Sequence, residues 1–183
     1  GTLLKDGTAV EGNSVTIQVA KNGEIPNSYT IAPNDGYSFQ ELETITSAVA
    51  IDVQAGNNHT VVLMSNGTVW ACGNNQYGQL GDGTTENRNN YVQMQDANGP
   101  ITNVTAIAAG GYHTVALKED GTVWACGYNK SAQLGIDSTY DSSIFVRMHD
   151  RTSYISNAKA IAAGDLHTVV LKKDGSVWAC GSN

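Results

Sequence analysis

Histidine and cysteine are the residues whose chemistry first suggests a functional site here, because each recurs at a constant interval. Three histidines and three cysteines repeat every 54 residues: His59, His113, His167, Cys72, Cys126 and Cys180. Both side chains are good zinc ligands, and a cysteine beside a histidine can act as a nucleophile. A structural zinc site needs four ligands, however, and each repeat supplies one histidine and one cysteine.

The constant interval argues for a structural role of these residues. Catalysis requires one activated nucleophile oriented by a third group, and nothing distinguishes one copy from the others. We therefore expect no catalytic residue, no cofactor and no metal site. The histidines are expected to be structural, each with a ring nitrogen bonded to a backbone group, and the cysteines to be small buried hydrophobic residues.

The interval extends to other residue types, so the sequence holds three copies of one unit. Glycines and tryptophans keep the same 54-residue step at Gly56, Gly110, Gly164, Trp70, Trp124 and Trp178. The copies read AGNNHTVVLMSNGTVWACGNN, AGGYHTVALKEDGTVWACGYN and AGDLHTVVLKKDGSVWACGSN. Self-similarity at a fixed period of this size is the signature of a repeat architecture.

Each copy predicts a β-hairpin. In the first copy, residues 59–64 are rich in β-branched and apolar side chains, and residues 68–72 form a second such run. Asn66-Gly67 lies between them and favours a type I′ turn, as do the Asp-Gly pairs of the other copies.

A type I′ turn also fixes which residues face each other. It predicts that Leu63 pairs with Trp70 and Val61 with Cys72. Because side chains alternate along a strand, His59 is then expected on the same face as these four. Both faces of the hairpin are largely apolar, which is expected for a sheet covered on both sides.

Further strands are expected on either side of each hairpin. Residues 104–109 and 158–163 precede the second and third copies and are rich in small apolar residues. Outer strands are expected near residues 91–94 and 144–148. Four strands in each repeat match the blade of a β-propeller.

The pattern A-G-x-x-H-T-x-x-L, then D-G-x-V-W-x-x-G-x-N, then G-Q-L-G, resembles the regulator of chromosome condensation repeat. The resemblance covers roughly residues 45–183 and implies propeller blades, since known members form seven-bladed propellers. It also implies protein binding. The sequence departs from the family at the three cysteines, where an aromatic residue is usual, and at residues 131–135, where the G-Q-L-G loop is degenerate.

We therefore predict an all-β fold, a partial propeller of about three to three and a half blades built from four-stranded antiparallel sheets. Residues 45–183 hold the three repeats. Residues 1–44 form a divergent β segment, either a degenerate half-blade or a small β-domain. Within it, strands are expected at 15–19 and 28–32, and a short helix around Gln40 to Thr46.

Composition excludes some classes of partner. The formal net charge is −7 and no run of Lys or Arg offers a path for a phosphate backbone, so we expect no nucleic-acid binding. No stretch approaches the roughly 20 apolar residues of a membrane span. Few Lys and Glu, with many Asn, Thr and Ser, favour an extracellular or cell-surface protein, as on a bacterial surface.

Binding residues are sought where the copies differ, because the repeat builds the scaffold and its loops carry function. The positions between the repeated Gly and His of each copy are the candidate protein-binding loop tips: Asn57, Asn58, Tyr112, Asp165 and Leu166. The leading hypothesis is a non-enzymatic protein-binding scaffold. The alternatives are a carbohydrate-binding propeller module and an architectural module of a larger adhesin.

The blade count leads to a prediction about assembly. About three and a half blades fall short of a closed propeller and leave apolar faces and unpaired strand edges at both ends. Two copies sum to seven blades, so the sequence predicts a homodimer that completes a propeller, with the N-terminal strands of one chain completing the last blade of the other.

Overall fold

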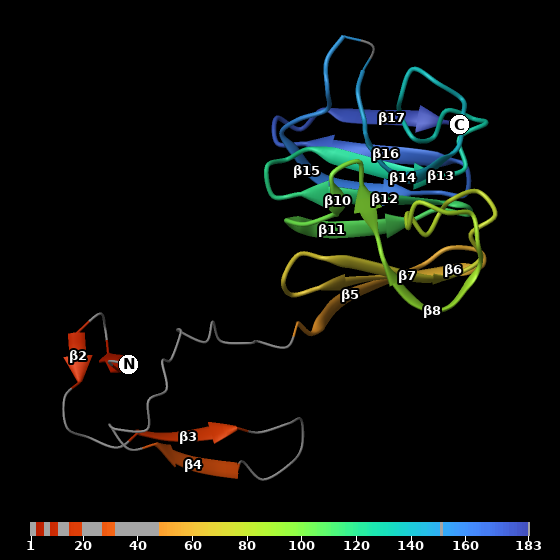
Figure 1. Ribbon diagram of the computed structural model, residues 1–183. Coiled ribbons are helices and arrows are strands. Elements are labelled where there is room, and N and C mark those ends of the chain that lie inside the picture. Colours follow the sequence, from red (N-terminus) through yellow and green to blue (C-terminus); the bar gives the residue numbers. More distant parts are fainter. Residues whose placement is uncertain are drawn as a thin grey trace. The chain divides into compact units, whose positions relative to one another are not determined.

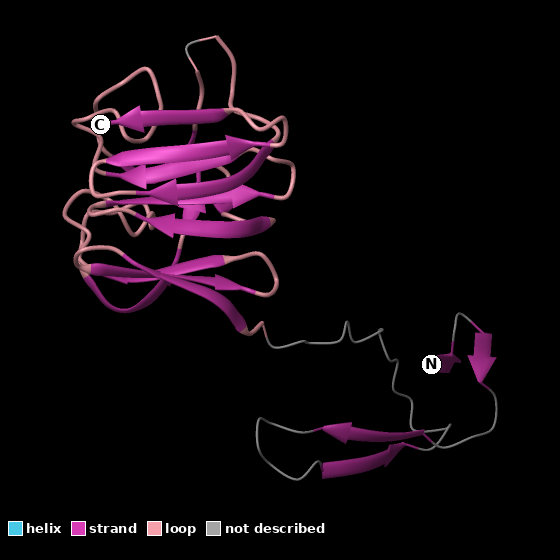
Figure 2. Ribbon diagram, turned by 180° about the vertical axis from the view of Figure 1, so that it is seen from behind, coloured by secondary structure: helices cyan, strands magenta, loops and turns pink. Residues whose placement is uncertain are grey.

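The computed structural model describes residues 48–150 and 152–182 in full, together with four short strands of residues 1–47 (Figure 1). The chain divides into two units, Gly1–Ser47 and Ala48–Asn183. Every regular element of the described residues is a β-strand (Figure 2). The predicted all-β fold is confirmed. No helix long and apolar enough to cross a membrane occurs among these residues.

The first unit contains two antiparallel hairpins. The strands β1 (Leu3–Lys5) and β2 (Thr8–Val10) form one, and β3 (Val15–Val19) and β4 (Asn27–Ile31) form the other. The last two lie where strands were expected. The short helix predicted near residue 40 lies outside the described residues, and the choice between a half-blade and a separate domain stays a prediction.

The second unit consists of three consecutive blades (Figure 1). In chain order their strands are β5 (Ala50–Ala55), β6 (His59–Met64), β7 (Val69–Gly73) and β8 (Arg88–Gln93) in the first blade; β11 (Val104–Ala109), β12 (His113–Lys118), β13 (Val123–Gly127) and β14 (Ser142–Arg147) in the second; and β15 (Ala158–Ala163), β16 (His167–Lys172) and β17 (Val177–Gly181) in the third. The sheets are antiparallel meanders in that order. The third sheet has three strands in the described residues.

A small hairpin joins the first blade to the second. Its strands are β9 (Gln95–Asp96) and β10 (Gly99–Pro100), and β9 pairs in parallel with β14, the outer strand of the second blade. The connection therefore ties two neighbouring blades together through backbone pairing as well as through side chains.

The register of the repeated hairpin differs by one residue from the expectation. Leu63 pairs with Val69, and Val61 with Ala71. The side chains of Trp70 and Cys72 therefore lie on the opposite face from His59, Val61 and Leu63. This arrangement separates the histidine and cysteine of each repeat, which were expected on one face.

The turn explains the shift. The Met64 N–H donates to the Thr68 carbonyl at 2.9 Å, and the Gly67 N–H donates to the Met64 carbonyl at 2.9 Å. Gly67 has a φ of +75°, while Asn66 is not among the residues with positive φ. A type I′ turn requires positive φ at both central residues, so the connection is a three-residue loop, a type I turn closed by a left-handed glycine.

Two apolar cores fill the spaces between blades. The first lies between blades one and two and the second between blades two and three. Val61, Leu63 and Val69 face the first core, while Phe145 enters it from the outer strand of the second blade, 1% exposed. Both faces of the second blade are thereby covered.

The repeated histidines join neighbouring blades. The Thr114 hydroxyl on β12 donates to the Gln79 carbonyl at 2.8 Å, and it accepts from Nε2 of His59 on β6 at 3.1 Å. The second interface repeats this arrangement with His113, Thr168 and Gln133. Each of these two histidines reaches a backbone carbonyl through a threonine hydroxyl on the next blade, and not by the direct bond to a backbone group that was expected.

The repeated glycine makes room for that histidine. A Cβ on Gly56 would overlap the imidazole of His59 and the carbonyl oxygen of Gly110 on the next blade. Gly110 has the same relation to His113 and to Gly164. Any larger residue would therefore separate two blades at their inner edge.

The repeated tryptophan closes the hairpin turn. Asp120 Oδ1 accepts from the N–H and the hydroxyl of Thr122, whose oxygen then accepts from Nε1 of Trp124 at 2.9 Å. The first blade has the same chain of bonds to Trp70. Lys118 lies over the Trp124 ring at 5.2 Å, and Lys172 over Trp178 at 4.8 Å. The tryptophans are thus part of the framework.

Candidate functional site

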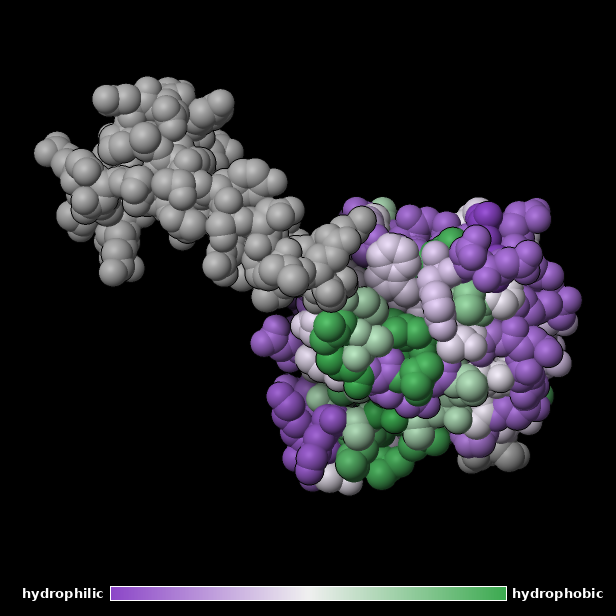
Figure 3. Space-filling model, turned by 90° about the horizontal axis from the view of Figure 1, so that it is seen from below, coloured by the Kyte–Doolittle hydropathy of each residue, from purple (hydrophilic) through white to green (hydrophobic). Residues whose placement is uncertain are grey.

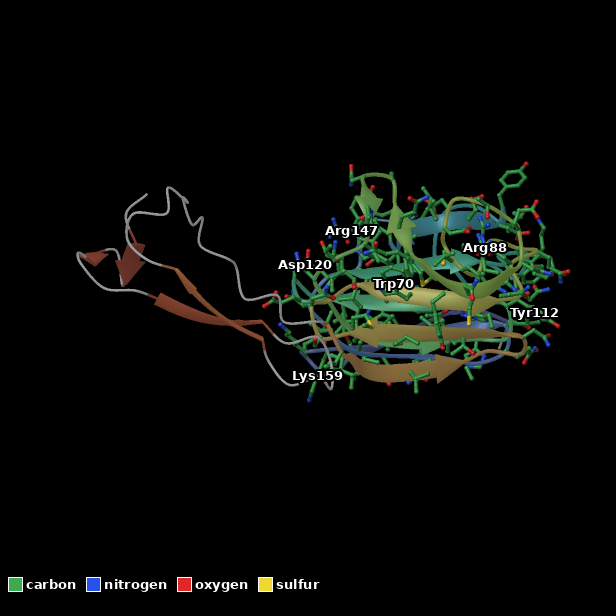
Figure 4. The ribbon with its side chains drawn as sticks, turned by 60° about the horizontal axis from the view of Figure 1, so that its bottom comes forward. Trp70, Arg88, Tyr112, Asp120, Arg147 and Lys159 are labelled. Atoms are coloured by element: carbon green, nitrogen blue, oxygen red, sulfur yellow. The ribbon has the colours of Figure 1, made fainter. Side chains whose placement is uncertain are left out.

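The loop tips singled out by the sequence lie together at one end of the blades. Figure 4 shows Tyr112 at this end and Asp120 and Lys159 at the opposite end. The Asn57 N–H donates to the Gly111 carbonyl at 3.2 Å, and the Gly111 N–H donates to the Asp165 carbonyl at 3.0 Å. The tips of three consecutive blades are therefore joined by their backbones into one rigid edge.

A side-chain bond spans the second blade at this edge. Nδ2 of Asn57, on the first blade, donates to Oδ1 of Asp165, on the third, at 3.1 Å. A Cβ on Gly111 would collide with both of these groups. Glycine at this position therefore lets the polar pair form, and Asp165 keeps an exposed carboxylate beside it.

Three tyrosine rings meet beside the polar edge. The ring centroids of Tyr77 and Tyr128 are 4.8 Å apart, those of Tyr77 and Tyr112 are 5.5 Å apart, and those of Tyr112 and Tyr128 are 6.4 Å apart. All three pairs are edge-to-face, the arrangement that aromatic quadrupoles favour. Each residue is half-buried, so the rings support one another and still present surface to solvent. We call these three residues the tyrosine surface.

The tyrosine surface belongs to one boundary between blades. Tyr77 lies in the loop after β7 of the first blade. Tyr112 directly precedes β12 and Tyr128 directly follows β13, so both lie at the open end of the second-blade hairpin. At the next boundary the matching residues are Ser131, Leu166 and Ser182. The framework is shared by both boundaries, and the aromatic cluster is a property of one.

One member of this surface was predicted from the sequence, and two were not. Tyr112 was among the predicted loop tips, together with Asn57, Asn58, Asp165 and Leu166. The backbone ladder brings Asn57 and Asp165 together, whereas Asn58 and Leu166 lie at their own blade tips. Tyr77 and Tyr128 were missed because they come from the loop that follows the hairpin.

That loop is held in place by one buried asparagine in each of the first two blades. Oδ1 of Asn75 accepts from the Leu80 N–H at 2.9 Å, and its Nδ2 donates to the Thr84 carbonyl at 3.0 Å and to Asp82 at 3.1 Å. Asn129 has the same role in the second blade. Both side chains are fully buried, so the loops that carry the tyrosines are rigid.

An ion pair fixes the outer part of the first loop. Arg88 Nε donates to Oδ2 of Asp82 at 2.8 Å, and Thr84 bonds the other carboxylate oxygen through its N–H and hydroxyl. Although burial opposes it, these bonds hold the pKa of Asp82 below its ordinary value. Both oxygens of the Asp82 carboxylate are therefore bonded to Thr84 and Arg88.

Cys126 and Cys180 contact the two packed cores, whereas Cys72 lies on the face of the first blade that points away from the second blade. All three were expected to be buried, and of the three Cys126 alone is, while the other two are half-buried. Cys126 is buried, and its Sγ lies 3.7 Å from the Gln79 carbonyl. Burial raises the pKa of Cys126 above its ordinary range and that of Cys180 to about 11, so both are thiols near neutral pH. Across residues 48–150 and 152–182, no cluster of three or more His, Cys, Asp or Glu side chains suited to a metal ion is found.

The sequence matches a family of repeats. The Regulator of chromosome condensation (RCC1) repeat matches residues 66–117, and a second description of that repeat matches residues 50–79, 104–133 and 158–183. Each of these three segments holds the inner strand and the hairpin of one blade. The matches thus follow the 54-residue period.

Two curated relatives illustrate the range of proteins that carry such repeats. An X-linked retinitis pigmentosa GTPase regulator homolog of Caenorhabditis elegans is 34% identical over 130 residues, which are 71% of this chain and 9% of that protein. The E3 ubiquitin-protein ligase MYCBP2 of Danio rerio is 43% identical over 86 residues, which are 47% of this chain and 2% of that protein. The chain therefore spans less than a tenth of either relative.

Solved structures show the same fold. Human WBSCR16 has a TM-score of 0.66 at 24% identity, over 79% of this chain and 36% of that chain. Prp20p from Saccharomyces cerevisiae, described with its binding to Gsp1p and histones, has a TM-score of 0.60 at 20% identity, over 72% of this chain and 33% of that chain. The three blades thus correspond to about a third of these proteins.

Proposed function

Because the chain belongs to the regulator of chromosome condensation (RCC1) repeat family, we propose that it is a non-enzymatic protein-binding scaffold whose partner contacts the tyrosine surface. The family hosts different activities on one framework, so a binding function has to be inferred from the residues of this site. The observation that supports this proposal most directly is the contact of Tyr77, Tyr112 and Tyr128 at one end of the blades.

Tyrosine clusters of this kind suit protein recognition. A tyrosine contributes a large apolar area with little loss of side-chain freedom, and it keeps a hydroxyl for hydrogen bonding. Residues that dominate binding energy are enriched in tyrosine and lie at the centre of rigid contact areas. The backbone ladder at the loop tips and the buried Asn75 and Asn129 supply that rigidity.

Charge indicates the kind of partner. The net charge is −7, and Asp165 adds an exposed carboxylate to the polar edge beside the tyrosines. Complementary charge speeds association and disfavours acidic partners. We therefore propose a protein partner with a neutral or basic contact surface, bound outside the cell or at a cell surface, which the low Lys and Glu content supports.

The test is quantitative capture of partners with matched tyrosine variants. Tyr112→Ala removes one ring of the tyrosine surface, and Tyr140→Ala removes a ring that is 80% exposed and lies outside that surface. Proteins captured from the native secretome should bind Tyr112→Ala at least about tenfold more weakly, as expected for a central contact residue, and Tyr140→Ala with little change. Equal loss in both variants, or in neither, would refute this surface.

Three other outcomes distinguish the alternatives. A glycan array that shows saturable binding abolished by Tyr112→Ala, with no captured protein, would favour the carbohydrate-binding module, since tyrosine rings also stack on sugars. Hydrolytic turnover lost on replacing one histidine or cysteine would overturn the non-enzymatic proposal. Capture of no protein and no glycan would favour an architectural module of a larger adhesin.

Self-association is a further part of the proposal. Figure 3 shows apolar side chains gathered on a face of the second unit, and the first blade exposes Ile51 (59%) and Val53 (62%). The third blade exposes Val177 (65%). Thr60 has the same repeat position as Thr114, and His167 the same as His59, so the two outer faces carry the residue types that pair at both internal interfaces.

We propose that two copies join these faces to complete a propeller. Light scattering should give twice 19.3 kDa at micromolar concentration, and the mass of one chain would refute the dimer.

A further inference from the structure

The loop after the third strand carries a fully buried glutamine in each of the first two blades, and the two glutamines differ in their hydrogen bonds. In the first blade, Oε1 of Gln79 accepts from the Tyr77 N–H at 3.0 Å, and its Nε2 donates to Oδ1 of Asn74 at 2.8 Å. In the second blade, Oε1 of Gln133 accepts from the Ser131 N–H at 3.0 Å, whereas its buried Nε2 has no hydrogen-bond partner among the described residues. One donor of the repeated loop is therefore unpaired in the second blade.

The unpaired amide follows from one residue of the tyrosine surface. Tyr128 has the same repeat position as Asn74, since each directly follows the glycine that ends the third strand. Its ring packs against Tyr77, with the centroids 4.8 Å apart, and it supplies no acceptor to Gln133. The bond of the first blade forms within a single loop, so its loss in the second blade does not depend on the blade that follows.

The other two tyrosines leave the framework bonds unchanged. Tyr77 and Ser131 hold the same repeat position, and the N–H of each donates to the glutamine two residues later. Tyr112 holds the position of Asn58, and the carbonyl of each accepts from the first loop residue, at 2.9 Å for Tyr112 and 2.8 Å for Asn58. Of the three tyrosines, Tyr128 is thus the one that replaces a side-chain bond of the framework.

A buried donor without a partner destabilises a folded chain, and such donors are rare. Departures from the rules of stable folding are expected where a residue serves function. We propose that Tyr128 determines which partner binds the tyrosine surface, and that the chain is less stable because this tyrosine replaces an asparagine. The inference rests on the proposed function and adds to it the ring that selects the partner.

A double-mutant cycle measures the unpaired amide without any partner. Gln133→Leu removes the amide, both in the parent chain and in the Tyr128→Asn variant, which restores the acceptor found in the first blade. In urea, Gln133→Leu should raise the unfolding equilibrium constant about fivefold more in the Tyr128→Asn background, as expected for one net hydrogen bond. The control cycle is Gln79→Leu with and without Asn74→Tyr. Its larger effect should occur in the parent chain, where the bond is present.

Binding by variants of Tyr128 tests its role in specificity. Proteins that the parent chain captures from the native secretome should bind Tyr128→Asn at least about tenfold more weakly, and Tyr128→Phe within about threefold of the parent because the ring is kept. The urea curves show whether both variants are folded. A purely structural role of Tyr128 would not give weaker binding by a folded Tyr128→Asn chain.

Two results would overturn this inference. One is unchanged binding by Tyr128→Asn while Tyr112→Ala binds weakly, which would leave the tyrosine surface in place without this role of Tyr128. The other is an absence of coupling between positions 128 and 133 while the first-blade cycle shows it. If Tyr112→Ala keeps its affinity, or if the parent chain captures no protein, the tyrosine surface itself is refuted and this inference with it.

Discussion

The strands β13 and β17 have the same five residues, Val-Trp-Ala-Cys-Gly, and differ in their surroundings. In β13 the valine is fully buried, and in β17 the same valine is 65% exposed. The tryptophan of β17 is 39% exposed. The difference arises because the second blade has a neighbour on each face and an outer strand on its sheet.

The comparison shows where the stability of a repeat protein is located. An isolated blade cannot cover its own apolar faces, so a residue stabilises the chain through the contact that the next blade completes. Identical residues should therefore contribute different free energies in the second and third blades. The following predictions test that difference, beginning with the largest effect.

Acid should lower the stability of the chain through its buried histidines, His59 and His113. Burial away from water is the main cause that lowers the pKa of His59 and His113 from 6.5 to about 4. The unfolded chain then binds more protons between these values, so the free energy of unfolding is fully retained above pH 6.5 and falls as the pH drops toward 4. The loss should reach about 3 kcal/mol for each histidine.

Urea unfolding at several pH values between 7 and 4 measures this loss. The variant His113→Gln should be less stable than the parent at pH 7 and should show a shallower dependence on pH. A parent chain whose free energy of unfolding is constant over this range would contradict the assigned burial.

Valine at the first position of the third strand gives the most direct comparison. Val123→Ala removes buried methyl groups and leaves a cavity in the second core, so it should cost about 2 kcal/mol of unfolding free energy. Val177→Ala removes the same atoms from an exposed site and should change stability by less than about 0.5 kcal/mol. Denaturation at a concentration where the chain is a monomer compares the two. Equal costs would show that the third blade is covered in solution.

The interblade hydrogen bonds give a smaller effect. Thr114→Val leaves the Gln79 carbonyl and the His59 N–H without their shared partner inside the interface, which should cost about 1–2 kcal/mol. Thr60→Val is the matched control, because Thr60 holds the same repeat position on a face that no other described blade covers. Thermal melts compare the loss of stability in the two variants. A larger loss for Thr60→Val would contradict the role of Thr114 between the blades.

The smallest effect concerns the loop after the third strand, which has Gly78 in the first blade and Ala132 at the same repeat position in the second. Ala132 has a φ of +62°, where the first blade has Gly78 at +84°. Left-handed alanine costs about 1 kcal/mol, and glycine recovers part of this, so Ala132→Gly should stabilise the chain by about 0.5 kcal/mol. Gly78→Ala should destabilise it, because its Cβ would lie 2.5 Å from the Ser143 Cα. Paired chemical denaturation curves resolve both signs.

The strand positions could be predicted from the sequence, and the hairpin register could not. The expected strands at 104–109 and 158–163 coincide with β11 and β15, because the 54-residue period repeats the same small apolar run before each hairpin. The outer strands β8 and β14 begin two or three residues before the predicted ranges 91–94 and 144–148. The register failed at Asn66-Gly67, because this dipeptide fits both a two-residue loop and a longer loop with one left-handed glycine. The choice depends on how the neighbouring blade packs against the turn.

The candidate site was predicted in part for a related reason. Tyr112 stands out within one hairpin, but its contacts with Tyr77 and Tyr128 depend on how two blades stack. A signal was present, because Tyr77 and Tyr128 replace serine or asparagine at the matching positions of other copies. The threonine partner of each histidine was missed because it belongs to the following blade.

The glycine at the inner edge of each blade has a consequence for how such chains change over generations. Gly56 packs against the backbone of Gly110, and Gly110 against that of Gly164, so consecutive blades meet through the same glycine contact. A tandem duplication of any 54-residue block would insert a blade whose glycine contacts already match those of its neighbours. Gain or loss of whole blades is therefore compatible with continued packing, while an insertion of a few residues between glycine and histidine would disrupt this contact.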